Sequence, residues 1–306
     1  MRNTIVNQIH DLAKTDKNIY FLTGDLGYSV IDNFQKEFPE RCLNMGISEQ
    51  NMMGAAAGLA LEGKKVFVYS IVPFVTMRCL EQIRTDVALQ NLDVTIIGVG
   101  GGFAYATLGP THHALEDIAM LRCIPRMKIV SPSDPVSAKI LFSQVLALPG
   151  PTYVRLNKGG EPALYKTSPD IKFGRGFVLK EGSDVCILSN GAITQVALEV
   201  AELLGHENIS VEVVDMATIK PLDEELIRQK LSSRKLVVSL EEHNIIGGFG
   251  SAVAEVAAEF QPRATFRRLG VKDVYSDVYG SQKFMRELNG LSAQQVCQTI
   301  KNLYEK

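Results

Sequence analysis

The 306-residue sequence predicts an α/β protein built from two doubly wound domains with mainly parallel sheets. Short strand-like runs alternate with segments whose apolar residues recur at helical spacing. This alternation occurs twice, and a stretch rich in Gly, Pro and polar residues over 157–170 separates the two sets. Such alternation is typical of parallel sheets covered by helices. We place the domains at residues 1–165 and 175–306, with the boundary near residue 172.

The strand-like runs are short and rich in Val, Ile, Tyr and Phe, the residues that favour strands. In the first half they are 19–23, 65–69, 94–99, 127–130 and 152–156. In the second half they are 184–189, 210–215, 235–240 and 264–269, and the helices lie near 192–205, 223–231, 248–260 and 292–304.

The unusual sequences of the first half follow strands. They occupy 23–29, 69–75 and 98–113, the last of which is rich in glycine. In an open parallel sheet, ligands bind beyond the carboxyl ends of the strands. We therefore expect the functional site of the first half at this edge. In the second half, Gly-Gly-Phe-Gly at 247–250 is compatible with either a ligand loop or a tight turn.

Glu49 stands at the start of a helix, 49–60, that is so rich in Ala and Gly that we expect it to be fully buried. An acidic residue in a first turn commonly caps helix amides or complements the helix dipole. A carboxyl group in an apolar wall can instead share a proton with a ligand. The position alone favours capping, so the surrounding motifs have to decide.

His112 and His113 follow the glycine-rich segment and Pro110. Adjacent histidines can bind a metal, but no Cys, Asp or Glu stands nearby at a metal-site spacing. Hydrogen bonding to a substrate or proton transfer is the better-supported function. A histidine pair in a loop is also compatible with a plain surface role.

Several function classes are excluded or unsupported. The chain has neither a Walker phosphate loop nor a complete dinucleotide-binding fingerprint. Its 32 basic and 34 acidic residues are nearly balanced, so no signature of nucleic-acid or anionic-membrane binding exists. No apolar run approaches the roughly 20 residues of a transmembrane helix. Five scattered cysteines predict neither disulfides nor zinc, and we expect a reduced, soluble, cytoplasmic protein.

Six motifs occur in a fixed order along the chain. They are G24-D-L-x-x-S, G46-I-S-E-Q-N-M, F74-x-x-M-R-C-L-E-Q-I-R, G109-P-T-H-H, M127-K-I-V-S-P-S-D and E241-E-H-N-I-I-G-G-F-G. With these motifs the chain resembles the C-terminal portion of transketolases and deoxyxylulose-phosphate synthases, above all the C-terminal subunit of split, two-chain transketolases. The resemblance implies a pyrimidine-binding domain followed by a transketolase C-terminal domain.

The resemblance also implies thiamine diphosphate as cofactor. In this family the glutamate that corresponds to Glu49 hydrogen-bonds the ring nitrogen of the aminopyrimidine and activates the cofactor. Asp25, Phe74 and Met77 would contact the cofactor as well, with Phe74 stacked on the pyrimidine. The implied reaction transfers a two-carbon ketol unit from a ketose or ketose phosphate to an aldose.

The same resemblance assigns substrate contacts to Ser29, His112, His113 and Lys158. His112 is the second implied catalytic residue. Lys158 stands where transketolases carry an arginine, and an ammonium group recognises phosphate as a point charge rather than a fork. Two other positions depart from the family, because Leu108 replaces an acidic residue and glycines near Gly100 replace a histidine. We therefore expect altered recognition of the sugar.

The family holds the diphosphate through Mg²⁺, which is bound by a G-D-G motif and an asparagine about 30 residues later. This chain has no such pair, and G24-D-L has the wrong third residue. Because Mg²⁺ needs oxygen ligands near the phosphates, the resemblance implies that an N-terminal transketolase subunit supplies them in an α2β2 assembly. No metal ligand is assigned to this chain.

Two other interpretations remain open. The beta subunit of a 2-oxo acid dehydrogenase-type decarboxylase shares this layout, although G109-P-T-H-H followed by A-L-E-D favours a transketolase. A non-catalytic subunit that only stabilises its partner is the third possibility, but such a role would not need a carboxylate at Glu49.

Overall fold

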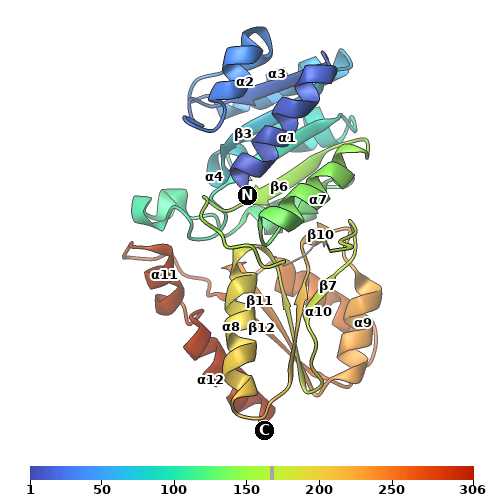
Figure 1. Cartoon of the computed structure of the whole chain (residues 1–306), viewed down its shortest axis with the longest axis vertical. Helices are drawn as coiled ribbons and strands as arrows, with labels where there is room; N and C mark the ends of the chain where they lie inside the picture. Colours follow the sequence, from blue (N-terminus) through green and yellow to red (C-terminus); the bar gives the residue numbers. More distant parts are fainter. Residues whose placement is uncertain (166–168) are drawn as a thin grey trace.

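The computed structural model describes residues 1–165 and 169–306, so residues 166–168 of the predicted linker lie outside the described part of the chain. Figure 1 shows two α/β units stacked along the long axis, with the N-terminal unit in blue to green and the C-terminal unit in yellow to red. Each unit contains a mainly parallel sheet with helices packed against it. The predicted fold class is confirmed.

The first sheet has the order β10-β5-β6-β4-β3-β1-β2, and its pairs are parallel except for β10 with β5. Its strands are β1 (Ile19–Thr23), β2 (Cys42–Asn44), β3 (Lys65–Ile71), β4 (Val94–Val99), β5 (Lys128–Val130), β6 (Thr152–Leu156) and β10 (Thr218–Lys220). The chain runs outward from β1 to β2 and then returns past β1 to β3. The strand order therefore reverses between β1 and β3, where doubly wound folds bind ligands.

Helices and short helical segments surround this sheet. They are α1 (Arg2–Thr15), α2 (Asp32–Glu37), η1 (Pro39–Arg41), α3 (Glu49–Leu61), α4 (Val72–Val75), α5 (Leu80–Gln82), η2 (Ile83–Ala88), η3 (Ala106–Leu108), η4 (Pro110–His112), α6 (Asp117–Arg122) and α7 (Pro135–Leu146). Helix α3 is not fully buried, contrary to the sequence prediction. Gly58 and Leu61 are exposed because no other element in the described part of this chain covers that face.

The second sheet has the order β12-β11-β8-β9-β7, with β7 antiparallel to β9 and the other pairs parallel. Its strands are β7 (Phe177–Lys180), β8 (Val185–Ser189), β9 (Val211–Asp215), β11 (Leu236–Asn244) and β12 (Thr265–Val271). The accompanying helices are η5 (Gly191–Ile193), α8 (Thr194–Gly205), α9 (Glu224–Ser233), α10 (Phe249–Ala258), α11 (Gln282–Leu288) and α12 (Ala293–Tyr304). Helices α8 and α12 pack on each other, as do α9 and α10.

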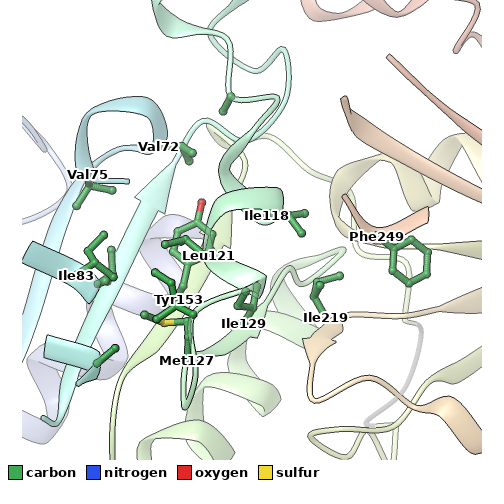
Figure 2. Packing of buried hydrophobic residues seen from close by; sticks show 14 of the residues in the cluster. Val72, Val75, Ile83, Ile118, Leu121, Met127, Ile129, Tyr153, Ile219 and Phe249 are labelled. Carbon is green, nitrogen blue, oxygen red and sulfur yellow. The ribbon is translucent and has the colours of Figure 1, made fainter. Parts of the chain in front are cut away.

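One apolar core continues from the first unit into the second. Figure 2 shows Leu121, Met127 and Ile129 of the first unit near Ile219 and Phe249, which follow the linker in sequence. Ile219 belongs to β10, which returns from the second unit to the edge of the first sheet. Sequence analysis did not predict this strand, because three residues are too few to show a periodic pattern.

A buried polar network also joins the two units. Asp215, at the end of β9, accepts hydrogen bonds from Ser133 Oγ at 2.7 Å and from Tyr165 OH at 2.7 Å. Ser133 follows β5, and Tyr165 lies at the start of the linker. Burial raises the pKa of Asp215 from 3.8 to about 7, although both hydrogen bonds oppose the rise. The native fold therefore favours a protonated Asp215.

We predict that Asp215→Asn changes the pH dependence of stability. A folded-state pKa above the unfolded value makes the native state bind more protons, so stability falls as pH rises from about 4 through 7. The neutral amide lacks this titration and still accepts a hydrogen bond. Thermal unfolding should favour the wild type near pH 4 and the variant near pH 8, with an upper limit of about 4 kcal/mol on the change. If the stabilities of the two proteins change with pH in the same way, the raised pKa of Asp215 is contradicted.

Candidate active site

A buried carboxylate lies at the point where the first sheet reverses its strand order. Glu49 is the first residue of α3, and its side chain is 1% exposed. Its Oε1 accepts a hydrogen bond from Ser70 Oγ at 3.2 Å, near the carboxyl end of β3. Its Oε2 pairs with Arg78 Nη1 at 2.5 Å. The carboxylate therefore bonds to side chains rather than to the amides of its own helix, which disfavours the capping interpretation.

Gly24 forms the wall beside this carboxylate, directly after β1. A Cβ at this position would lie 3.3 Å from Glu49 Oε1 and 3.4 Å from the Gly46 carbonyl oxygen. A side chain here would press on the carboxylate from the β1 side. With glycine here, the backbone passes close to the carboxylate without a clash.

Phe74 presents its ring to two side chains of the site. The guanidinium carbon of Arg78 lies 4.5 Å from the ring centroid, and the His112 ring meets Phe74 edge-to-face at 5.1 Å. A planar cation thus stacks on an aromatic ring and also hydrogen-bonds the buried Glu49 carboxylate. Phe74, Glu49 and His112, which are far apart in sequence, are thus brought together into one cluster, with Arg78 joining Glu49 to Phe74.

The two adjacent histidines point to different neighbours. His112 is partly buried, and its Nδ1 lies 3.0 Å from Thr111 Oγ1. His113 is buried against Phe103, with ring centroids 5.1 Å apart, and its Nε2 has no hydrogen-bond partner in the described part of the chain. Burial lowers the pKa of both imidazoles, so they are predominantly neutral at pH 7. Only His112 joins the Glu49 cluster.

The other predicted site residues lie at the exposed rim or further away. Asp25 follows Gly24 and accepts a hydrogen bond from Asn44 Nδ2 at 3.0 Å. Ser29, with φ +64°, donates its backbone N–H to Asp32, and Met77 is exposed next to Arg78. Lys158 lies apart from the cluster, and its Nζ is 5.2 Å from the centroid of the Tyr105 ring.

The segment that carries His112 is closed into a loop at its base. Gly102 and Ala114 exchange two backbone hydrogen bonds of 3.0 and 2.9 Å. Arg155 Nη2 donates to the Ala114 carbonyl at 2.9 Å, and Arg155 Nε donates to the buried Asp117 at 2.8 Å. On the opposite side, Glu242 of the second unit accepts the backbone N–H of Phe103 at 2.6 Å. The loop is therefore fixed from both domains.

Sequence analysis missed two residues that contact Glu49. Ser70 lies within the loop predicted at the end of a strand, and Arg78 lies within the F74-x-x-M-R motif, but neither was given a function. Ser70 lies near the carboxyl end of β3, a position that could have marked it as a site residue. The pairing of Arg78 with Glu49 depends on how the chain turns after β3, which no local pattern indicates.

Neither a metal cluster nor a membrane span emerges from the described chain. Within residues 1–165 and 169–306, no group of three or more His, Cys, Asp or Glu side chains is arranged to hold a metal ion. In the same part of the chain, none of the helices combines the length and the apolar character needed to cross a membrane.

Two family models match the chain in succession. The model described as transketolase, pyrimidine binding domain, matches residues 1–161, and the model described as transketolase, C-terminal domain, matches residues 174–296. The Glu49 cluster lies wholly within the first match. Glu242 lies within the second.

Relatives of similar length are subunits of transketolases. One subunit of the apulose-4-phosphate transketolase of Phocaeicola vulgatus is 36% identical, over 100% of this chain and 97% of its own. A subunit of the 6-deoxy-6-sulfo-D-fructose transketolase of Clostridium sp. (strain MSTE9) is 34% identical, over 100% and 95%. A solved structure of a split gene transketolase, described as an inactive β4 tetramer, superposes with a TM-score of 0.86, at 38% identity over 98% and 96% of the two chains.

We predict that Gly102→Ala destabilises the protein more than Gly63→Ala. Both glycines have positive φ, +65° and +77°, so an alanine costs about 1–2 kcal/mol at either position. At Gly102 the new Cβ would also lie 2.6–2.7 Å from the Glu242 side chain, whereas at Gly63 nothing lies within 4 Å. Thermal unfolding should show that the free energy of unfolding of Gly102→Ala is lower by a further ~1–3 kcal/mol, a cost typical of overpacking. Equal losses of stability in the two variants would show that the Glu242 side chain moves away from the new Cβ at no cost.

Proposed function

The chain belongs to the transketolase family, and from this premise we propose that it is the C-terminal subunit of a two-chain, thiamine-diphosphate-dependent transketolase. It would supply Glu49 to activate the aminopyrimidine, while a partner subunit carries the diphosphate and Mg²⁺ site. The observation that carries this proposal is the arrangement of Arg78 between Glu49 and Phe74.

The Arg78 guanidinium serves as a stand-in for a heterocycle in this arrangement. It is planar, it stacks on Phe74 at 4.5 Å, and it donates a hydrogen bond to Glu49 at 2.5 Å. An aminopyrimidine is also a planar group that needs an aromatic face and a carboxylate acceptor. The Arg78 side chain is 42% exposed, so it borders solvent into which it would move when the ring binds. The residues present therefore fit the cofactor's ring.

Glu49 is suited to hold a proton at the ring nitrogen. Ser70 fixes Oε1, and the buried surroundings strengthen any hydrogen bond that Oε2 makes once Arg78 leaves. The chemistry that thiamine diphosphate supplies when bound is an electron sink for breaking and forming carbon–carbon bonds. His112, neutral because burial lowers its pKa, can donate one hydrogen bond to a sugar hydroxyl.

The partner would be an N-terminal transketolase subunit in an α2β2 assembly. Support comes from the relatives, which are named as subunits, and from the β4 tetramer, which is described as inactive. We propose that the ligands of Mg²⁺ lie on that partner. An incomplete site in the isolated chain is consistent with a cofactor held between two polypeptides.

The substrates would be sugars with an anionic end group. The names of the relatives include a sugar phosphate and a sulfosugar. Lys158 and Arg2 line a hollow of about 400 Å³, so two positively charged side chains stand beside it. Leu108, which replaces an acidic residue of the family, is exposed on the site loop. We propose that it alters the choice of sugar.

We predict that Glu49→Gln abolishes most activity of the reconstituted enzyme. The purified chain is mixed with its partner subunit, thiamine diphosphate, Mg²⁺ and a ketose, and ketol transfer is followed. Loss of the proton-holding carboxylate should lower kcat by about 10²–10⁴-fold. Ser70→Ala, which keeps the carboxylate, should lose far less. Full turnover by Glu49→Gln would remove Glu49 from the catalytic site.

We predict that Arg78→Ala tightens thiamine diphosphate binding to the assembled enzyme. Because the Arg78 side chain is 42% exposed, its ion pair with Glu49 contributes about 1 kcal/mol. The cofactor has to displace Arg78 from Glu49, so removing this side chain should lower the Kd of thiamine diphosphate by about two- to fivefold. Calorimetric titration measures this change, and Arg84→Ala, an arginine nearby in the sequence, controls for net charge. A weaker affinity in Arg78→Ala would mean that Arg78 helps to hold the cofactor.

A further inference from the structure

The ligand-binding position of the second sheet is filled by the first domain. The chain leaves β8 for β9 on one side and returns to β11 on the other, so the strand order reverses between β8 and β11. Ligands of doubly wound sheets bind at this position. Here the remaining cavity has a volume of only about 10 Å³, between Asn190 and Glu242 on one side and Gly101 and Arg155 on the other.

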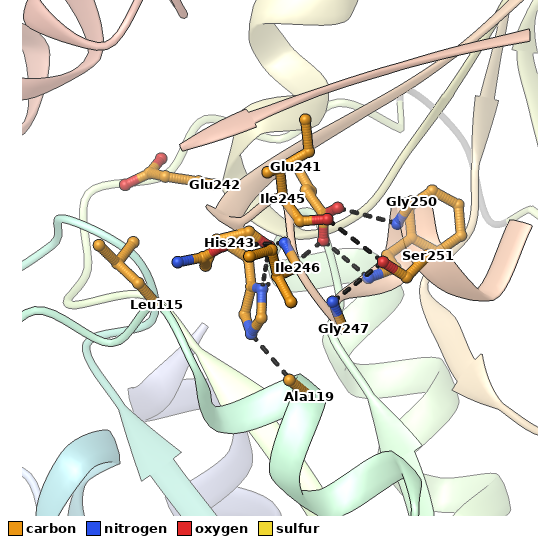
Figure 3. A network of polar contacts seen from close by, with 12 residues as sticks. Leu115, Ala119, Glu241, Glu242, His243, Ile245, Ile246, Gly247, Gly250 and Ser251 are labelled. Carbon is orange, nitrogen blue, oxygen red and sulfur yellow. Dashed lines mark hydrogen bonds and ion pairs between the residues drawn. The ribbon is translucent and has the colours of Figure 1, made fainter. Parts of the chain in front are cut away.

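Two adjacent glutamates on β11 serve different domains. Glu241 accepts the N–H groups of Phe249 and Gly250 at 2.7 and 2.8 Å, at the start of α10 in its own domain. Figure 3 shows Glu241 directed toward Gly250, while Glu242 points away from it. This divergence follows from the alternation of side chains along a strand. Glu242 is the residue that reaches the first domain.

Glu242 is held on one side and binds the loop on the other. Arg286 Nε donates to its Oε2 at 2.6 Å, and Gln282 Nε2 donates to its Oε1 at 2.9 Å, both from α11. The same Oε1 accepts the Phe103 N–H at 2.6 Å, and the side chain packs beside Gly102. Only 5% of the residue is exposed, so these charge-assisted hydrogen bonds are shielded from water.

The bound loop determines where His112 lies. Phe103 and Gly102 begin the segment that closes at Ala114, and His112 lies within this closed segment against Phe74. A chain of backbone hydrogen bonds links Phe103 to His112: Ala106 N–H donates to Phe103, Gly109 N–H to Ala106, and His112 N–H to Gly109. A shift at Phe103 would be transmitted along this chain. Glu49 and Ser70, in contrast, stand on α3 and β3 and do not depend on the loop.

We infer that Glu242 is a positioning residue, through which the second domain fixes the His112 loop for substrate binding. This inference rests on the proposed function only where it concerns the substrate. The placement of the loop by Glu242 is a property of the chain itself and can be measured without any activity.

Hydrogen exchange of the isolated chain and kinetics of the assembled enzyme test the inference together. Glu242→Ala should speed amide exchange in 100–113 about tenfold while leaving α3 unchanged. It should also raise KM for the ketose about tenfold with little change in the Kd of thiamine diphosphate. Glu242→Gln keeps an oxygen for the Phe103 N–H but turns an amino group toward Arg286, so it should lie between the wild type and Glu242→Ala on both measures. A tenfold effect corresponds to about 1.4 kcal/mol.

Glu255→Ala is the matched control, because Glu255 also pairs across the domains, with Arg122 Nη1 at 2.9 Å, but away from the loop. It should change neither measurement. Unchanged loop exchange and KM in folded Glu242→Ala, or equal effects in Glu255→Ala, would overturn the inference. If Glu242→Ala does not fold, Arg286→Ala, which removes an anchor of Glu242, takes its place under the same criteria. If Glu242→Ala speeds loop exchange but the wild-type assembly has no transketolase activity, only the proposed function is refuted.

Discussion

Burial of the Glu49 carboxylate is the constraint on which the rest of the site depends. A buried charge is costly unless it is paired and hydrogen-bonded, and the first sheet meets this need with Ser70 and Arg78. Both partners come from β3 or the turns after it, while Glu49 begins the helix that precedes β3. Gly24, which follows β1, packs against the same carboxylate, so the site lies where β1 and β3 pair, at the strand reversal. Fold and chemistry are linked at this one place.

The two sheets use the same topological position in different ways. In the first, the reversal point places a carboxylate beside a glycine and, through Arg78, beside an aromatic ring. In the second, the corresponding position is closed by the loop of the first domain, with Glu242 bound to the Phe103 amide. The second domain would therefore contribute to function by supporting the loop that the first domain uses.

Much of this arrangement was predictable from the sequence, for identifiable reasons. The β-branched runs located the central strands, and the carboxyl-end rule placed Phe74 and His112 at one edge. Glu49 was linked to them only through the family resemblance. The pattern could not indicate β10, a three-residue strand that crosses to the other sheet, nor the pairing of Arg78 with Glu49. It also treated His112 and His113 alike, although the turn at η4 directs them to different neighbours. Tertiary contacts decide these features.

We propose that the ring of thiamine diphosphate takes the place of the Arg78 guanidinium, between Glu49 and Phe74. The most direct measurement is a crystal structure of the chain assembled with its partner subunit, thiamine diphosphate and Mg²⁺. We expect the aminopyrimidine on the Phe74 face, its ring nitrogen hydrogen-bonded to Glu49, and the Arg78 side chain moved aside. A bound cofactor whose ring lies elsewhere, with the Arg78–Glu49 pair intact, would contradict this account.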